Sequence, residues 1–336
     1  MMNISSQAAE TAKKTYRVGF LVMPQFSMIA LSCVMDPLRE ANWVGGRALY
    51  DWVLITPEGP QVHASNGTCL IAEAGLDAAM ECDMLIVCAS FDLERYSTSE
   101  VLSTLRKLMR HGVILGSIDT GSYILAKAGL LNDCHATIHW ENAVSFSEQF
   151  PRVKLTNEIF TIDGNCWTCS GGSSGIDMML HLIHQQHGSE ISGGVAECAI
   201  LSGARGGHTQ QRMSLRNRLN ITDPSLNAAI QVMEANCADR LSVPDIAIQT
   251  GISQRQLGRV FHNYLGITPV AYYANLRLER ARALLKQTSL QINTIAASCG
   301  YTSSAQFSRL YKNAFGVQPS KDRTPLEADF RIRNTP

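Results

Sequence analysis

The sequence predicts two domains, an α/β domain followed by an all-α domain of seven helices that contains two helix-turn-helix motifs. Two observations support this division. Short apolar runs alternate with helical stretches in the first part of the chain, and an internal repeat of helical segments fills the last part. We place the α/β domain at residues 15–190, a glycine-containing linker at 191–220 and the all-α domain at 221–323.

The apolar runs of the first domain have the length of buried strands, and helical stretches near residues 27–43 and 98–110 separate them. Strands that are apolar throughout and alternate with helices predict a mainly parallel sheet covered on both faces, as in flavodoxin-like folds. Ligands of such sheets bind at the carboxyl ends of the strands, near the reversal of strand order. The expected strands are residues 16–23, 50–56, 84–89 and 113–118.

Composition excludes several classes of protein. With 45% hydrophobic and 17% charged residues, the chain is globular rather than disordered. Its longest apolar stretches, such as 84–90, are shorter than the ~20 residues of a membrane span, and residues 1–14 lack the apolar segment of a signal peptide. The 10 cysteines have no regular spacing, which suits reduced thiols. We therefore expect a cytoplasmic protein without a membrane partner, and we assign it no cofactor.

The two parts of the chain carry opposite charge. Residues 1–204 hold 12 Lys and Arg against 21 Asp and Glu, whereas residues 205–336 hold 17 against 8. A basic half beside an acidic half indicates that one domain meets a polyanion such as DNA. Solvated charges divided by chance would give the same counts, so the motifs must decide.

An internal repeat defines the second domain. Residues 241–269 and 290–319 align at an offset of 49 and then 50 residues. A repeat of this period means two copies of one supersecondary unit. Residues 269–285 between the copies have helical periodicity and are expected to form a rigid spacer helix. The matching pairs include Ile246/Ile295, Gly251/Gly300, Arg259/Arg309, Gly266/Gly316 and Pro269/Pro319.

Each copy has the pattern of a helix-turn-helix. In the first copy, capping boxes at Ser242 and Ser253 begin two helices on either side of a tight turn at Gly251. In the second copy, Ser303 caps the corresponding second helix. Apolar residues three and four apart predict one buried face for each second helix. The residues expected to be buried are Leu257, Val260, Phe261 and Tyr264 in the first copy and Phe307, Leu310 and Tyr311 in the second.

The free faces of the two second helices carry basic, amide and small hydroxyl side chains. A capped helix with such a face suits insertion into the major groove of double-stranded DNA. Arg and Lys would contact phosphates, and Ser, Gln and Arg would read base edges. The alternative, two helix pairs with merely solvated faces, does not account for two copies in register on a basic half. The candidate DNA-binding residues are Gln254, Arg255, Arg259 and His262 in the first copy and Ser304, Ala305, Ser308, Arg309 and Lys312 in the second.

Residues 221–323 resemble the DNA-binding module of the AraC/XylS family. The resemblance rests on the stretch GYTSSAQFSRLYK at 300–312 and on Arg277, Ala281, Leu284 and Leu285 in the spacer helix. It implies that both recognition helices enter successive major grooves on one face of the DNA, and that the protein activates transcription through contact with RNA polymerase. We also expect a homodimer, because two linked modules on paired half-sites gain affinity through effective concentration.

A strand of the first domain runs directly into a helix through a sharp turn at Asp119. The segment 113–126 resembles the nucleophile elbow of the glutamine-amidotransferase-like superfamily, the PfpI-type proteases and their relatives, which have a Cys at the apex. The resemblance continues through 126–131, 136–141 and 169–177. Together with the AraC-type module, it matches a regulator subgroup that controls catabolism of glycine betaine, carnitine and related amines or amino acids. It implies that the first domain senses a metabolite.

The first domain departs from its superfamily at the nucleophile. Asp119 stands where the Cys is expected, and Ala30 occupies the place of the nearby acid. A carboxylate is a poor replacement for a thiolate nucleophile, so His139 alone predicts no acyl chemistry and we assign no catalytic residue. One alternative is a bifunctional regulator that retains hydrolase or amidotransferase-like activity. Another is a first domain that serves only as an assembly surface.

The carboxylate at the apex is the candidate ligand site. A negative charge beside aromatic faces binds ammonium groups well, so we expect the small-molecule inducer to be a cationic amine. Asp119 alternatively caps the helix that follows. Trp43 and Trp167 are less secure candidates, because tryptophans commonly pack in cores. The ligand-binding candidates are Asp119, Thr120, Tyr123, His139 and Trp140.

Two short motifs invite a zinc site that we do not assign. Cys166 and Cys169 lie on an expected strand, where residues three apart point to opposite faces. His181 and His184 lie on an expected helix whose other face is apolar. We interpret these residues as structural cysteines and a solvated helix face, and we expect no metal.

Overall fold

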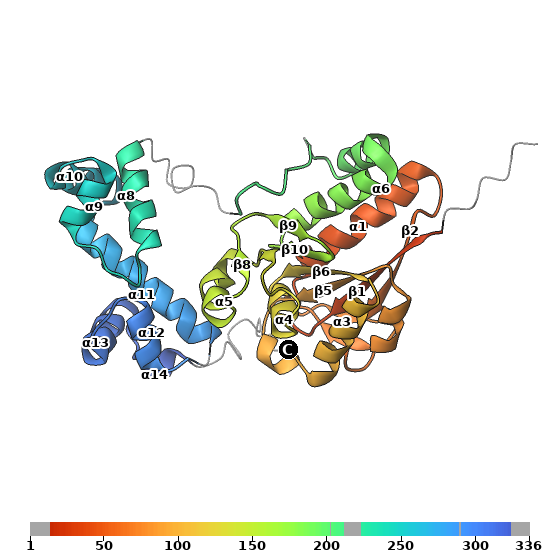
Figure 1. Ribbon diagram of the computed structural model, residues 1–336, viewed down its shortest axis with the longest axis horizontal. Helices are drawn as coiled ribbons and strands as arrows, with labels where there is room; N and C mark the ends of the chain where they lie inside the picture. The colour runs from red at the N-terminus through yellow and green to blue at the C-terminus, as the bar shows by residue number, and fades with distance from the viewer. Residues whose placement is uncertain (1–13, 202, 212–222, 289, 324–336) are drawn as a thin grey trace, which may run out of the picture. The chain divides into compact units, whose positions relative to one another are not determined.

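The computed structural model describes residues 14–201, 203–211, 223–288 and 290–323 (Figure 1). The chain divides into two compact units between Gln211 and Arg212. None of the described helices is long and apolar enough to cross a membrane.

The first unit is built on a six-stranded sheet with the strand order β2-β1-β5-β6-β10-β9. All neighbouring strands pair in parallel except β9, which runs antiparallel to β10 at the edge. The predicted α/β class is confirmed, and the four expected strands begin and end within one residue of their predicted positions. The strands are β1 (Tyr16–Val22), β2 (Tyr50–Ile55), β5 (Met84–Ala89), β6 (Ile114–Asp119), β9 (Phe160–Asp163) and β10 (Cys166–Cys169).

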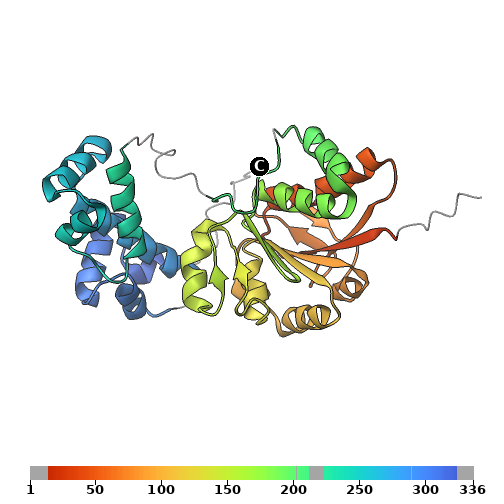
Figure 2. The same ribbon diagram turned by 45° about the horizontal axis from the view of Figure 1, so that its top comes forward.

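Helices cover both faces of this sheet (Figures 1 and 2). Alternate residues of a strand point to opposite faces, so Ile86 of β5 packs in the core under α1 and α6, whereas Val87 packs in the core under α3 and α4. These helices are α1 (Met28–Gly45), α3 (Ser99–Arg110), α4 (Ser122–Lys127) and α6 (Ser174–Cys198). Shorter elements connect them: β3 (Gln61–His63), β4 (Cys69–Ile71), η1 (Leu76–Glu81), α2 (Leu93–Tyr96), β7 (His135–Ala136), η2 (Trp140–Asn142), α5 (Ala143–Gln149) and β8 (Lys154–Leu155).

The first unit continues past residue 190, where the sequence predicted its end. Helix α6 bends at Gly188, which has a φ of 84°, and then runs on to Cys198. A Cβ at Gly194 would lie 2.7 Å from a methyl group of Val44 on α1, so this glycine permits two helices to pack closely rather than forming a linker. Residues 205–211 also bond to the first unit. The rest of the predicted linker, residues 212–220, lies outside the described residues.

The described part of the second unit is all-α and has the seven predicted helices. Helices α9 (Val243–Thr250) and α10 (Gln254–Leu265) form the first helix-turn-helix, and α12 (Ile292–Ser298) and α13 (Ser304–Phe315) form the second. The spacer α11 (Pro269–Gln287) lies between them in the chain. Helix α8 (Pro224–Ala235) precedes this arrangement, and α14 (Pro319–Asp322) follows it.

The predicted caps set the limits of these helices. Ser242 and Ser253 form capping boxes, and Gly251 ends α9 with a φ of 69°. The prediction that Tyr264 is buried in the core of the first copy is wrong, because this residue is 45% exposed. Leu265, the last residue of α10, packs against the core instead. In the second copy, Phe307 and Tyr311 are fully buried and Leu310 is half-buried.

Candidate functional sites

The candidate DNA-binding side chains lie on one exposed face of each recognition helix. On α10, Gln254, Arg255, Arg259 and His262 are all exposed. On α13, Ser304, Ala305, Arg309 and Lys312 are exposed and Ser308 is half-buried. The Ser304 hydroxyl donates to Asn293 Oδ1 of α12 at 2.9 Å. Two matched basic faces on capped helices are suited to the major groove.

A buried arginine of the spacer helix holds the second helix-turn-helix in place. Arg277 is 4% exposed, and its guanidinium donates to the carbonyl oxygens of Cys299 and Gly300 at 2.7 Å each. The same group lies 4.2 Å from the centroid of the Tyr301 ring. A Cβ at Gly300 would lie 2.7 Å from the carbonyl oxygen of Ala238, which precedes α9. The turn of the second motif therefore lies against the loop between α8 and α9.

The predicted elbow is present at the carboxyl end of β6. Asp119 has a φ of 59°, a conformation that few residues other than glycine adopt, and α4 begins three residues later. A Cβ at Gly121 would lie 2.3 Å from the carbonyl oxygen of Val87, and one at Gly171 would lie 2.8 Å from Asp119 Cα. Two glycines thus allow the backbone to close around the aspartate.

Asp119 is a buried carboxylate at this elbow. It is 8% exposed, and Ser90, which follows β5, donates to its Oδ2 at 3.1 Å. Burial raises the pKa of Asp119 to about 6, while the charge of His139 and the Ser90 bond oppose the shift and Glu141 adds to it. The N-cap residue of α4 is Gly121, so Asp119 does not occupy the N-cap position of that helix.

The other predicted ligand residues make different contacts around Asp119. The backbone N–H of His139 donates to the Asp119 carbonyl at 3.0 Å, and the rings of His139 and Trp140 are 5.6 Å apart. Trp140 is 39% exposed. Thr120 is buried, and its hydroxyl donates to the carbonyl oxygen of Ser90 at 2.9 Å.

Tyr123 differs from this group because its ring lies in the core. It is 6% exposed and makes an edge-on contact with Phe150. Its hydroxyl donates to Glu94 Oε1 at 2.8 Å, away from the Asp119 carboxylate contacts. Trp167 is also a core residue, whereas Trp43 is 79% exposed on α1.

The sequence analysis did not identify Ser90 and Glu141 as members of this site. Ser90 follows Ala89, which pairs directly with Asp119 between β5 and β6. This strand register is the signal that would have found it. Glu141 lies two residues after His139, and its Oε2 is 4.0 Å from His139 Nδ1. The elbow therefore combines two carboxylates, an imidazole and a partly exposed indole.

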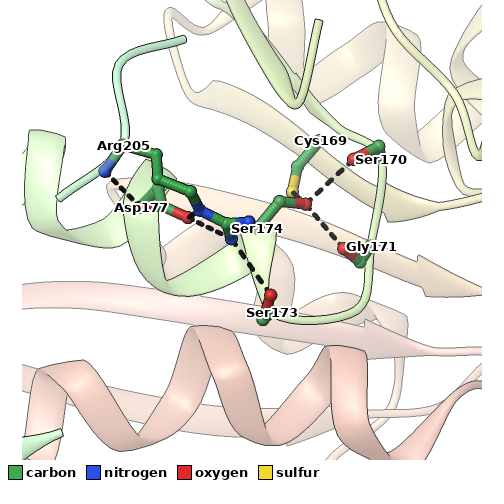
Figure 3. Close-up of polar contacts among 7 residues, drawn as sticks. All are labelled: Cys169, Ser170, Gly171, Ser173, Ser174, Asp177 and Arg205. Carbon is green, nitrogen blue, oxygen red and sulfur yellow. Dashed lines mark hydrogen bonds and ion pairs between the residues drawn. The ribbon is translucent and has the colours of Figure 1, made fainter. Parts of the chain in front are cut away.

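The segment 169–177 lies next to the elbow, because Gly171 packs against the backbone of Asp119. Figure 3 shows the polar contacts within this segment. The Ser174 hydroxyl donates to the carbonyl oxygen of Gly171 at 2.6 Å and lies 3.1 Å from Cys169 Sγ. Burial raises the pKa of the Cys169 thiol to about 11. Near neutral pH this cysteine is therefore a structural thiol rather than a thiolate nucleophile.

The two cysteines of the C-x-x-C motif lie on opposite faces of β10, as predicted. Cys166 belongs to the core under α3 and α4, and Cys169 belongs to the core under α1 and α6. His181 is half-buried beside Phe160 and Trp167, and burial lowers its pKa. Among the described residues, no group of three or more His, Cys, Asp or Glu side chains is placed to hold a metal ion.

The fold and its sites define a class of protein, a DNA-binding regulator in which an α/β unit with an elbow precedes a duplicated helix-turn-helix. Comparisons support the same division. The model of the DJ-1/PfpI family matches residues 16–185, and that of a helix-turn-helix domain matches residues 246–324. The chain belongs to the AraC family of transcription regulators with an N-terminal domain of DJ-1/PfpI type.

Similar proteins have the same two-domain architecture. The HTH-type transcriptional regulator GbdR of Pseudomonas aeruginosa is 40% identical over 91% of this chain and 83% of its own length. CdhR of the same species is 39% identical over 92% of both chains. A crystal structure of an AraC family regulator from Pseudomonas putida, 28% identical, covers 55% of this chain and 99% of its own with a TM-score of 0.50. The protein is a DNA-binding transcription regulator.

Proposed function

We propose that the protein activates a catabolic operon in response to a small cationic amine or amino-acid-derived metabolite that binds at the Asp119 elbow. The observation that carries this proposal is the buried carboxylate of Asp119 at the carboxyl end of β6. A charge that burial disfavours is stabilised when an ammonium group binds beside it. Glu141 adds negative potential, and the indole of Trp140 offers an aromatic face for a cation.

The resemblance to regulators of amine and amino-acid catabolism directs the choice of ligand. Glycine betaine and carnitine each carry a quaternary ammonium group, which binds to aromatic faces beside a negative charge. The exposed part of Trp140 and the nearby His139 ring supply such a surface. We therefore place these two compounds first among the candidate inducers.

The first unit acts as a receptor rather than as an enzyme. The apex residue Asp119 lacks the thiolate of the superfamily's nucleophile, and the pKa of the neighbouring thiol of Cys169 is raised by burial. A bifunctional regulator would need a nucleophile that these residues do not provide.

The second unit supplies the DNA contacts through the exposed faces of α10 and α13. Activation then follows from recruitment of RNA polymerase to the promoter. A homodimer would bind paired half-sites and gain affinity from effective concentration. Because the target is promoter DNA, the place of action is the cytoplasm.

A thermal-shift screen of the full-length protein tests the ligand. The panel holds glycine betaine, carnitine, sarcosine, choline and arginine, with Asp119→Asn as the test variant and Asp51→Asn as a control. Asn tolerates the left-handed backbone of Asp119, and Asp51 is exposed on β2. At a hundredfold excess over Kd, a bound amine raises the melting temperature by about 5 °C or more.

A shift with one amine that is lost in Asp119→Asn and kept in Asp51→Asn is the expected result. A panel without any shift would reject the amine inducer and leave the DNA-binding assignment unchanged. A shift in Asp119→Asn equal to that of the wild type would show that the Asp119 carboxylate does not contribute to binding of the amine.

A further inference from the structure

Residues 205–211 form an ordered strap on the first unit, immediately before the chain enters the segment that leads to the second unit. The Ile159 N–H donates to the carbonyl oxygen of Thr209 at 2.8 Å, and the Gln211 N–H donates to that of Asn157 at 2.9 Å. Gln210 pairs with Glu158 in an antiparallel bridge. The strap thus extends the fold of the first unit like a short added strand.

Arg205 anchors the beginning of the strap (Figure 3). Its backbone N–H donates to Asp177 Oδ1 at 2.6 Å, and its Nε and Nη2 donate to Asp177 Oδ2 at 3.0 and 2.7 Å. Asp177 is buried in the first turn of α6, with 3% of its side chain exposed. Arg205 Nη2 also donates to Ser173 Oγ at 3.0 Å. A buried carboxylate that needs these donors fixes the position of the strap.

Gln211 anchors the other end. Its side-chain amide donates to Thr137 Oγ1 at 2.7 Å and to the carbonyl oxygens of Ile138 and Glu158 at 2.9 and 3.2 Å. Both Thr137 and Ile138 are buried. The amide nitrogen has two hydrogens, so one of them is shared between two of these three acceptors, and the contacts hold the strap against residues 137 and 138.

Both anchors attach to segments that also frame the elbow. The N–H of His139, next to Ile138, donates to the Asp119 carbonyl, so Gln211 is linked to the elbow through two residues. Ser173 belongs to the loop in which Gly171 lies against Asp119 Cα. A displacement of either segment by a ligand at the elbow would disturb one anchor of the strap.

We propose that docking of the strap is thermodynamically linked to the conformation of the elbow, and that the strap is the element through which the first unit controls DNA binding by the second. This proposal rests on the proposed receptor function of the elbow. Linkage is reciprocal. If ligand binding at the elbow changes the docking of the strap, then loosening the strap must also change the conformational stability of the elbow.

Hydrogen exchange of the full-length protein, measured without any amine, tests the linkage. The variants are Gln211→Ala and Arg205→Ala, and the control is Arg152→Ala, whose guanidinium pairs with the exposed Asp133. We expect the elbow peptides, residues 117–125 and 135–142, to exchange about fivefold faster or more in both strap variants. The control should exchange like the wild type.

Unlike Arg205→Ala, Gln211→Ala leaves no buried charge without its partner. If Arg205→Ala fails to fold, Gln211→Ala alone is compared with the wild type and the control. Elbow peptides that exchange at the wild-type rate in a folded Gln211→Ala protein would overturn the linkage. This result does not depend on the amine screen, so failure of the inducer and failure of the strap can be told apart.

Control of DNA binding is tested on operator DNA selected by the wild-type protein from a random library. The Kd of Gln211→Ala for this DNA is expected to differ from that of the wild type by about fivefold or more, while Arg152→Ala keeps the wild-type value. Faster exchange at the elbow together with an unchanged Kd would confine the strap to the first unit and overturn the proposed control of the second.

Discussion

At the scale of single residues, Asp119 combines strain and burial in one position. Its left-handed backbone is one that few residues apart from glycine, asparagine and aspartate adopt. Its low exposure opposes an ionised carboxylate, and Ser90 is a neutral donor that offsets only part of the cost of burying the charge. Strained and desolvated groups at the ends of parallel strands are typical of ligand sites. We therefore expect a cationic ligand to stabilise the ionised carboxylate of Asp119.

The raised pKa of Asp119 predicts a pH dependence of stability. Because the folded pKa of about 6 lies above the ordinary value of 3.8 for an aspartate, the folded state binds the proton more tightly than the unfolded state. The stabilisation by this proton is complete below about pH 4 and is lost as the pH rises through about 6. Asp119→Asn is neutral throughout, so the wild type should lose about 2 kcal/mol relative to this variant between pH 4 and pH 7.

Urea unfolding of both proteins at several pH values measures this difference, with Asp51→Asn as the control for an exposed aspartate. A pH-independent difference between wild type and Asp119→Asn would contradict the raised pKa. Amine affinity should rise over the same pH range, since the ammonium group prefers the ionised carboxylate. His139 and Glu141 also face Asp119 and remain in both proteins.

The sequence was sufficient to find Asp119 and His139 but insufficient to find Ser90 and Glu141. The elbow is a local pattern of strand, apex and helix, and local patterns are readable without knowledge of the fold. Ser90 joins the site through the register of β5 and β6, which depends on the whole sheet. Tyr123 was proposed from its distance along the helix, yet its hydroxyl bonds to Glu94 on α2.

At the scale of elements, α11 sets the relation between the two helix-turn-helix motifs. Arg277 ties this helix to the turn at Cys299 and Gly300, and Tyr273 of the same helix donates to the carbonyl oxygen of Asn236 beside the first motif. A Cβ at Gly300 would collide with the carbonyl oxygen of Ala238 in the loop between α8 and α9. Helix α11 therefore contacts both the turn of the second motif and the loop that precedes the first, and we expect it to fix the spacing of the two recognition helices.

Loosening this connection should relax the spacing that the protein requires in its operator. Arg277→Met keeps an apolar stem and loses both carbonyl contacts, and Arg277→Lys cannot make both contacts in the same geometry. An added base pair between the two contacted grooves turns the second groove by about a tenth of a helical turn. We expect the wild type to bind this DNA about tenfold more weakly than the intact operator. Arg277→Met should show a smaller ratio between the two affinities, because it loses buried hydrogen bonds worth ~1–3 kcal/mol.

Arg282→Met is the matched control, because Arg282 lies on the same helix and pairs with Asp322 of α14 rather than with the turn. Fluorescence titration of both DNAs gives the discrimination ratio of each protein. A ratio for Arg277→Met equal to that of the wild type would show that Arg277 does not set the spacing. Arg277→Lys should lie between the two.

Element boundaries also show why glycine was misread in the sequence. Gly193 and Gly194 suggested a linker because glycine often marks turns, whereas Gly194 serves close packing of α6 on α1. A glycine required by a neighbouring helix looks the same in the sequence as one required by a turn. Strands and capped helices were predicted well because their signals, apolar runs and Ser-x-x-Asp or Ser-x-x-Gln boxes, lie within the element itself.

At the scale of the whole molecule, the acidic part of the chain contains the proposed receptor and the basic part contains the proposed DNA contacts. Binding to phosphates releases counterions, so affinity falls as salt rises in proportion to the number of phosphates neutralised. An acidic receptor adds no such contacts, and the second unit alone should set the salt dependence. The equivalent places of Arg259 and Arg309 in the repeat predict equal roles on the DNA.

Arg259→Ala and Arg309→Ala should each lower the slope of log affinity against log salt by about one. The double variant should lose about two, because the residues lie on separate helices and their effects add. Arg110→Ala removes the same charge from an exposed position on α3 of the first unit and should leave the slope unchanged. Titration of the selected operator between low and physiological salt measures the slopes of the four variants and of the wild type. If the slope does not change but the variants discriminate less between bases, the two arginines contact base edges rather than phosphates. Unequal slopes in the two single variants would contradict the equivalence that the repeat predicts.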